Sequence, residues 1–281
     1  MDVTGQNPEP RGVIRREFVV GAAAALAGAL LGAPLRARTS QTSVAPPPSR
    51  DALIEDLVAA NRILAQHGIV DGFGHVSVRD ERDPQRFFLS RSLAPERVSA
   101  ADILEFDLES HTVSAKGPGY SERFIHGEIY KARTDVNAIV HSHSPSVIPF
   151  GVSGVALRPV YHMAAFIGDG VPVFDIRKAA GITDMLVSDS ARGRALAQVL
   201  GARPVVLMRG HGVVVVGSSL PIAVGRSIYV ESNAKIQSQT LALGGSITYL
   251  SPEEARQVMV AGENGGYQRA WDLWKQQAIV K

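Results

Sequence analysis

Two histidines separated by a single residue, His141 and His143, stand in an apolar segment whose pattern is typical of a β-strand. Alternate residues of a strand point to the same face, so the two imidazoles can bind one metal ion together. Glu122 precedes them at the start of a helix-like segment, and His211 follows between two glycines. Three imidazoles and a carboxylate would suit a zinc ion. The alternative is that two of the eight histidines lie close together by chance on a partly buried strand.

The composition narrows the chemistry further. The 281 residues include no cysteine, which excludes disulfides, thiolate nucleophiles and thiolate ligands, so a metal must be held by nitrogen and oxygen. The net charge is +2, and no long basic run follows the N-terminal region, so nothing in the charge pattern points to nucleic acid as a partner. With 45% hydrophobic and 20% charged residues, the chain can bury one sizeable core. We therefore expect one catalytic domain.

The N-terminal residues 1–37 have the pattern of a twin-arginine export signal. Arg15 and Arg16 precede a mildly hydrophobic segment rich in alanine and glycine, and cleavage can follow Ala37. The apolar stretch is shorter than the roughly 20 residues that span a bilayer. We expect a periplasmic protein with no stable membrane span after export, tethered to the membrane only if the signal stays uncleaved.

A spacer and a long domain come after the signal. Residues 38–50 are rich in serine, threonine and proline and include Pro46-Pro47-Pro48, which excludes helix and central strand. This segment is predicted to be a disordered linker, and residues 51–281 the catalytic domain. Export in the folded state, with a cofactor already inserted, fits a metalloenzyme better than a simple binding module.

Hydrophobic periodicity predicts alternating helices and strands in the domain. The first helix is expected from Asp51 to Gln66, with Asp51 as its N-cap and Gly68 as its stop. The remaining pattern predicts strands at 72–79 and 87–89, a helix at 122–133, the strand of the two histidines, strands at 204–208 and 213–216 on either side of His211, and a helix at 221–243. This alternation favours a layered α/β/α domain.

The motifs and their order resemble the class II aldolase/adducin family over most of the domain. The matching elements are Gly74-His75-Val76-Ser77-Val78-Arg79, Ser121-Glu122, the helix end Tyr130 to Asp135, Val140-His141-Ser142-His143, and Arg209-Gly210-His211-Gly212. The resemblance implies a three-layer α/β/α sandwich around a mainly antiparallel sheet, in a homotetramer with active sites between subunits.

The same resemblance assigns roles to residues. It makes His141, His143 and His211 the metal-binding histidines. Glu122 would bind the metal when the site holds no substrate, and it would serve as acid/base during turnover. His126, one helical turn after Glu122, is interpreted as a packing residue rather than a ligand.

Departures from the family pattern concern the substrate. Members that act on sugar phosphates, such as fuculose-phosphate aldolases, typically have Gly-Asn, a Thr-Pro-Thr-Gly-like loop and paired serines where this chain has His75, Arg91 and a tyrosine before Ser121. Charge-assisted bonds from His75 and Arg91 suit a free carboxylate better than a phosphate. Tyr161 and His162 replace a tyrosine that several sugar aldolases supply from the neighbouring subunit, and they are candidates for proton donation or for interface packing.

The sequence therefore predicts a metal-dependent carbon–carbon lyase that works on a hydroxylated carboxylate through a metal-stabilised enolate. The family includes known decarboxylases of hydroxylated aromatic acids. The altered phosphate-holding positions make this chain resemble those members more than the phosphosugar enzymes. Aldol cleavage and decarboxylation both stay open. Zinc is the expected metal, with manganese or cobalt as substitutes. Alternatives are a non-catalytic adducin-like interaction module, and dehydratase or epimerase chemistry on the same metal scaffold.

Overall fold

The computed structural model describes residues 49–113, 117–262 and 266–279, so the export signal and most of the linker lie outside the described residues. The strands are β1 (His75–Arg79), β2 (Arg86–Ser90), β3 (Ile103–Asp107), β4 (Ala138–Ser142), β5 (Val173–Phe174), β6 (Val205–Met208) and β7 (Gly212–Gly217). The α-helices are α1 (Arg50–Gln66), α2 (Phe124–Ala132), α3 (Ile148–Val152), α4 (Ile176–Ala180), α5 (Ser190–Leu200), α6 (Leu220–Ala242), α7 (Pro252–Val260) and α8 (Gln268–Ile279). Short 3₁₀ turns are η1 (Pro95–Arg97), η2 (Ala100–Asp102), η3 (Ser121–Arg123) and η4 (His162–Ile167).

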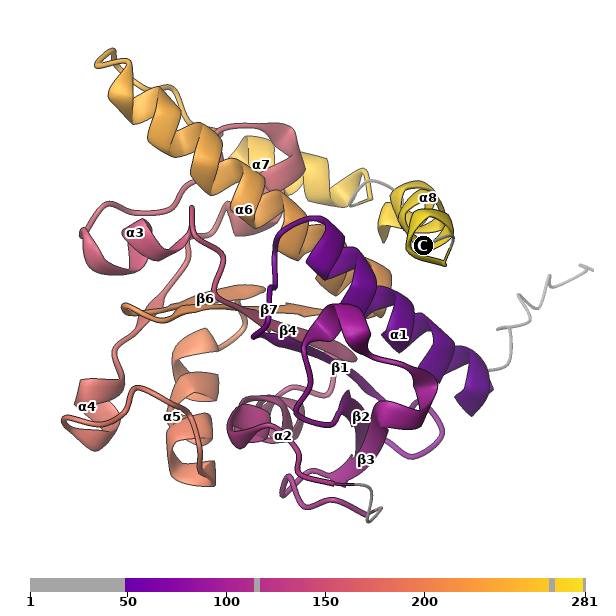
Figure 1. Ribbon diagram of the computed structural model, residues 1–281. Helices are drawn as coiled ribbons and strands as arrows, with labels where there is room; N and C mark the ends of the chain where they lie inside the picture. Colours follow the sequence, from indigo (N-terminus) through magenta and orange to yellow (C-terminus); the bar gives the residue numbers. More distant parts are fainter. Residues whose placement is uncertain (1–48, 114–116, 263–265, 280–281) are drawn as a thin grey trace, which may run out of the picture. The chain divides into compact units, whose positions relative to one another are not determined.

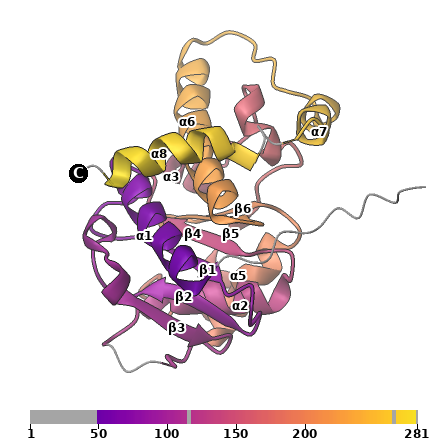
Figure 2. The same ribbon diagram turned by 90° about the vertical axis from the view of Figure 1, so that its right-hand side faces the viewer.

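The strands form one seven-stranded sheet in the order β3-β2-β1-β4-β7-β6-β5. Neighbouring strands are antiparallel except β5 and β6. Figures 1 and 2 show α1, α6 and α8 on one face of this sheet and α2 and α5 on the other. The expected three-layer fold around a mainly antiparallel sheet is confirmed.

Alternation along the central strands divides the core between the two helical layers. On β1 and β4, Val76, Val78 and Val140 pack with α1, α6 and α8, where Trp271 and Trp274 are also buried. Ile139 points to the opposite face and packs with α2 and α5. Since side chains alternate, His75, Ser77 and His141 also point toward the layer of α2. These three polar side chains therefore gather on one face.

The first helix begins one residue before its expected start. Ser49 is the N-cap, and its hydroxyl accepts a hydrogen bond from the backbone N–H of Ala52 at 3.1 Å. Asp51 lies in the first turn, where its charge favours the helix dipole. Gly68 follows the helix with a φ of +66°, as expected of a stop residue.

A tight turn joins β6 to β7 and carries His211. Gly210 has a φ of +64°, and a Cβ atom on Gly212 would lie 2.1 Å from the carbonyl oxygen of Ser142 on the neighbouring strand. Glycine at position 212 is therefore required for β7 to approach β4.

Within the described ranges, no helix is both long enough and apolar enough to cross a membrane.

Candidate metal centre

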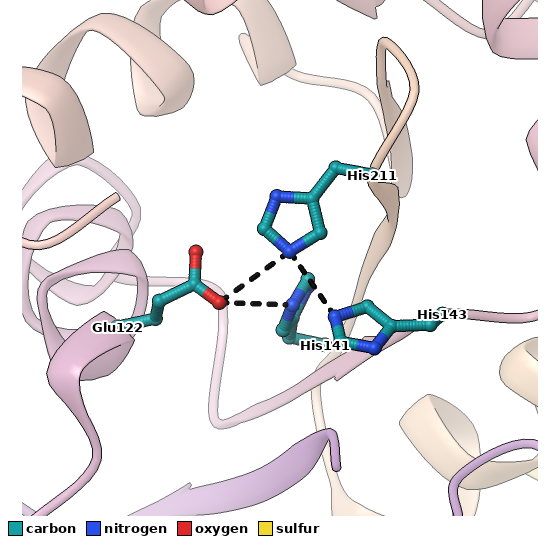
Figure 3. A group of neighbouring side chains, drawn as sticks. All are labelled: Glu122, His141, His143 and His211. Carbon is teal, nitrogen blue, oxygen red and sulfur yellow. Dashed lines mark hydrogen bonds and ion pairs between the residues drawn. The ribbon is translucent and has the colours of Figure 1, made fainter. Parts of the chain in front are cut away.

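The structure brings together all four predicted metal ligands. One ligand atom from each of Glu122, His141, His143 and His211 lies within 4.8 Å of all the others, and Figure 3 shows the four side chains converging. Oε2 of Glu122 is 3.4 Å from Nε2 of His141 and 3.5 Å from Nε2 of His211. The Nε2 atoms of His143 and His211 are 3.1 Å apart. This convergence of three imidazoles and a carboxylate is the donor set that divalent zinc takes.

Each ligand comes from the end of an element. His141 lies on β4, but this strand ends at Ser142, so His143 stands one residue beyond it. Glu122 lies in the turn η3, with φ −90° and ψ 18°, directly before α2. His211 is in the turn between β6 and β7. The expectation that one strand carries both His141 and His143 holds for His141 alone, although both side chains reach the same site.

Backbone carbonyls orient two of the imidazoles. Nδ1 of His141 is 3.2 Å from the carbonyl oxygen of Val213, and Nδ1 of His211 is 3.1 Å from that of Met185. A carbonyl only accepts, so each Nδ1 carries the proton and each Nε2 keeps its lone pair for the centre. Nε2 of His141 is buried and has no hydrogen-bond partner among the described residues. A buried nitrogen of this kind is costly without a partner, and a bound cation would supply one.

The loop before α5 completes the site and was missed by sequence reasoning. The N–H of Val187 donates to Oε1 of Glu122 at 2.9 Å, and the carbonyl of Met185 orients His211. Met185 has a φ of +68°, which a hydroxyl of Thr183 supports by accepting from its N–H at 2.9 Å. Strained backbone of this kind persists only where the surroundings hold it. Nothing in the sequence except the turn-forming residues of this loop could have pointed to it.

The electrostatics suit a cation. Burial opposes the charge of Glu122, but the neighbouring His141 and His211 outweigh it, so the pKa of this carboxyl falls well below its ordinary value. Burial, followed by the same two histidines, lowers the pKa of His143 to about 4. Burial also lowers the pKa of His211, but its bond to Glu122 more than compensates and raises it overall. The site thus combines an ionised carboxylate with a neutral His143 at pH 7.

A cavity of about 380 Å³ opens beside the centre. Glu122 and His143 line it, together with the aromatic and apolar side chains of Phe73, Leu93 and Tyr120. Its described lining includes no lysine and no arginine. Phe73 is 70% exposed, and the centroid of its ring lies 6.4 Å from that of the His143 ring. These walls suit a planar, apolar substrate body with its polar groups toward the ligands.

A larger hollow of about 450 Å³ lies elsewhere, beside α7. Its charged side chains pair with one another, as in the ion pairs Arg133–Asp135 and Arg256–Asp169. None of the four predicted metal ligands lines it, so the smaller cavity is the better candidate for the active site.

Two of the three residues expected to bind substrate line the cavity, and the third does not. His75 and Ser121 line the cavity. Arg91 is not among its lining residues; its Nε donates to Oδ1 of Asp102 at 2.7 Å, while its terminal nitrogens have no hydrogen-bond partner within the described residues. Its contact with a substrate carboxylate stays a prediction.

Tyr161 and His162 stand at the start of η4 and do not line the cavity. Tyr161 packs against the core of α6 and β6, whereas His162 is exposed. A single chain does not bring them to the metal ligands. Their role at a subunit boundary stays a prediction.

Comparisons with known proteins agree with this geometry. The sequence-family model of the class II aldolase and adducin N-terminal domain matches residues 55–238 of this chain. The chain is 36% identical to the decarboxylase tropJ of Talaromyces stipitatus over 79% of its length and 92% of that protein. It is 30% identical to a 3,4-dihydroxyphthalate decarboxylase of Arthrobacter keyseri, over 77% of this chain and 90% of that one.

The fold is also similar to a solved structure of an L-fuculose 1-phosphate aldolase from Glaciozyma antarctica. The TM-score is 0.68 at 24% identity, over 83% of this chain and 93% of the other. This match concerns the fold, while the family model covers the segment that carries all four predicted metal ligands. The chain belongs to the class II aldolase/adducin family, in which its curated relatives include decarboxylases.

Proposed function

We propose that this protein is a metal-dependent lyase that removes carbon dioxide from a hydroxylated aromatic acid. The observation that carries the proposal is the cluster of three histidines and Glu122 at the edge of a cavity with aromatic walls. The names of the two curated decarboxylases support decarboxylation over aldol cleavage. Retention of the full ligand set argues against a non-catalytic interaction module.

The donor set fits a divalent metal such as zinc. His141, His143, His211 and Glu122 would hold it, and Nε2 of His141, which has no hydrogen-bond partner among the described residues, would gain a bond to the ion. When bound, such an ion supplies Lewis acidity toward oxygens of the substrate. Manganese or cobalt could occupy the same nitrogen and oxygen ligands.

The chain's own residues would position the acid and move the proton. Phe73 and Leu93 offer apolar contact to an aromatic ring, and Tyr120 adds a third wall. When the bond between the ring carbon and the carboxylate breaks, carbon dioxide leaves and the electron pair stays on the ring carbon. Glu122, in its protonated form within the complex, would then give its proton to that carbon. The low pKa of Glu122 in the free site means that the carboxyl must take up a proton during the cycle.

The reaction products test the proposal. The zinc-loaded protein is incubated with hydroxylated aromatic acids, aliphatic hydroxy acids and a sugar phosphate, and carbon dioxide and aldehyde are measured. We expect carbon dioxide from the hydroxylated aromatic acids and no aldehyde from the sugar phosphate. The same protein treated with a chelator is the control. Aldehyde without carbon dioxide would identify an aldolase, and dehydration or epimerisation alone would assign the third class.

Two further proposals concern location and assembly. We propose export to the periplasm through Arg15 and Arg16, and a homotetramer in which Tyr161 and His162 reach the site of a neighbouring subunit. Both follow from sequence patterns and the family resemblance.

The export proposal predicts a simple outcome. The double substitution Arg15→Lys, Arg16→Lys should retain the protein in the cytoplasm, because the twin-arginine route requires the pair. Fractionation of cells measures this, with Arg11→Lys as the matched control that leaves the pair intact. Equal periplasmic amounts of the double variant and the wild type would refute the proposal.

A further inference from the structure

A chain of hydrogen bonds runs through the interior behind His75. Nδ1 of His75 is 2.7 Å from Nε2 of His126, and Nδ1 of His126 is 2.6 Å from Oγ of Ser77. Ser77 in turn lies 2.8 Å from the hydroxyl of Tyr130. We call His126, Ser77 and Tyr130 the buried hydrogen-bond chain. Its three members are at most 1% exposed.

The periodicities of a strand and a helix bring these residues together. His75 and Ser77 alternate on β1 and so share a face, while His126 and Tyr130 are one turn apart on α2. The surroundings are apolar, and the ring of His126 stacks on Phe87 with centroids 6.3 Å apart. Polar groups are costly in such a core unless each has a partner. Each link of the chain therefore depends on the next.

The far end of the chain favours one direction of donation. The hydroxyl of Tyr130 lies 3.4 Å from the carbonyl oxygen of Asn137, which can only accept. If Tyr130 donates there, Ser77 must donate to Tyr130, and His126 must donate its Nδ1–H to Ser77. Nε2 of His126 is then the acceptor for Nδ1–H of His75. The opposite direction would leave the contact between Tyr130 and Asn137 without a hydrogen.

The near end of the chain reaches the candidate active site. His75 lines the cavity, and it lies directly opposite His141 in the register of β1 and β4, with ring centroids 5.0 Å apart. No described residue forms a hydrogen bond with its Nε2. His75 is 3% exposed, and no described acidic side chain forms an ion pair with it. A charge without such a partner is costly in a buried site, so the ring is neutral. A neutral imidazole with a proton on Nδ1 has a free lone pair on Nε2.

We propose that the buried hydrogen-bond chain positions His75 in its Nδ1–H tautomer, so that Nε2 accepts a hydrogen bond from a hydroxyl of the substrate. His75 is then a specificity-determining residue that favours a hydroxyl at this place over a methoxy group or a carboxylate. This assigns His75 the role of an acceptor, whereas the sequence predicted a donor to a carboxylate. The inference rests on the proposed function only in taking a hydroxylated acid as the substrate.

Nitrogen NMR of the protein tests the tautomer without any measurement of turnover. The zinc-loaded protein is labelled with ¹⁵N in its histidines, and the variant His75→Gln identifies the signals of His75. We expect a protonated Nδ1 and an unprotonated Nε2. Ser77→Ala removes the acceptor of His126 and should shift His75 toward the Nε2–H form, while Ser77→Thr keeps a hydroxyl and should restore the original form. A proton on Nε2 in the wild type would overturn the proposal.

The matched control for this substitution is Ser227→Ala. Ser227 is also buried, and its hydroxyl donates to the carbonyl of Ala223 within α6 at 2.8 Å. Its loss should leave the signals of His75 unchanged. If Ser77→Ala does not fold, Tyr130→Phe serves instead, because it removes the fixed end of the chain and retains Ser77. Unchanged His75 signals in a folded Ser77→Ala or Tyr130→Phe variant would also overturn the proposal.

Kinetic measurements then test which substrate group Nε2 of His75 recognises. A hydroxylated aromatic acid that the wild type converts is compared with its methoxy analogue. We expect the wild type to prefer the hydroxyl by about tenfold or more in kcat/KM, and Ser77→Ala and Tyr130→Phe to lose most of this preference. If these variants change the tautomer of His75 but keep the preference for the hydroxyl, His75 does not recognise the substrate hydroxyl. If the wild type converts no hydroxy acid, the proposed function fails while the NMR result on His75 still stands.

Discussion

Glu122→Gln is expected to lower kcat about 100- to 10,000-fold while the protein stays folded, because it removes the group that gives and takes the proton. Glutamine has nearly the same shape as glutamate. Its side-chain oxygen can still accept the N–H of Val187, which donates to Oε1 of Glu122 at 2.9 Å. What is lost is the negative charge and the protonatable oxygen that faces His141 and His211. Turnover and metal content are measured on the same preparation.

Metal content separates the two roles of Glu122. If the variant binds zinc but turns over slowly, the carboxyl acts as acid/base; if zinc is lost as well, its role as a ligand dominates. Glu128→Gln is the matched control, because Glu128 is likewise buried but lies on α2, where it is paired with Lys131 at 3.0 Å, away from the cavity. This control should retain activity. A loss of less than threefold in Glu122→Gln with metal bound would exclude the catalytic role.

The sequence predicts most of the metal centre because the ligands obey local rules. A two-residue period places His141 on the inner face of a strand, and the glycines beside His211 permit the tight turn between β6 and β7. Each rule involves only neighbouring residues. The same holds for the sheet and its helices, whose periodicity is visible in the chain.

What the sequence did not predict depends on contacts between distant segments. The loop of Met185 and Val187 orients His211 and Glu122 through its backbone groups. Contacts of this kind cannot be predicted from side-chain types, because every residue has a backbone carbonyl and almost every residue has an N–H. Arg91 makes an ion pair with Asp102, a choice of partner that a motif cannot reveal. The sequence predicts a packing role for His126, and this residue is indeed buried, but its two ring nitrogens form hydrogen bonds with His75 and Ser77. Burial follows from helical periodicity, whereas the partner of a buried polar group does not.

Removal of the metal is expected to abolish activity and to lower Tm. An ion bound only by the folded protein stabilises it by about 2.7 kcal/mol when its free concentration is one hundred times Kd. The effect should be clear here, because without an ion Nε2 of His141 is buried with no hydrogen-bond partner among the described residues. Dialysis against a chelator followed by readdition of zinc tests this, with turnover and Tm as the two measurements.

The substitution His143→Ala identifies the ligands themselves. Changing a residue that only orients a ligand typically weakens metal binding by about 10- to 100-fold, so loss of a ligand should cost at least about tenfold. His143 is the best choice because it stands beyond the end of β4 and its loss spares the strand. The control is His111→Ala, since that side chain is 74% exposed and outside the cluster. Zinc affinity and the zinc-dependent rise in Tm should fall in His143→Ala and stay unchanged in His111→Ala. Equal zinc affinity of His143→Ala and the wild type would remove His143 from the ligand set and leave His141, His211 and Glu122 as a three-ligand site.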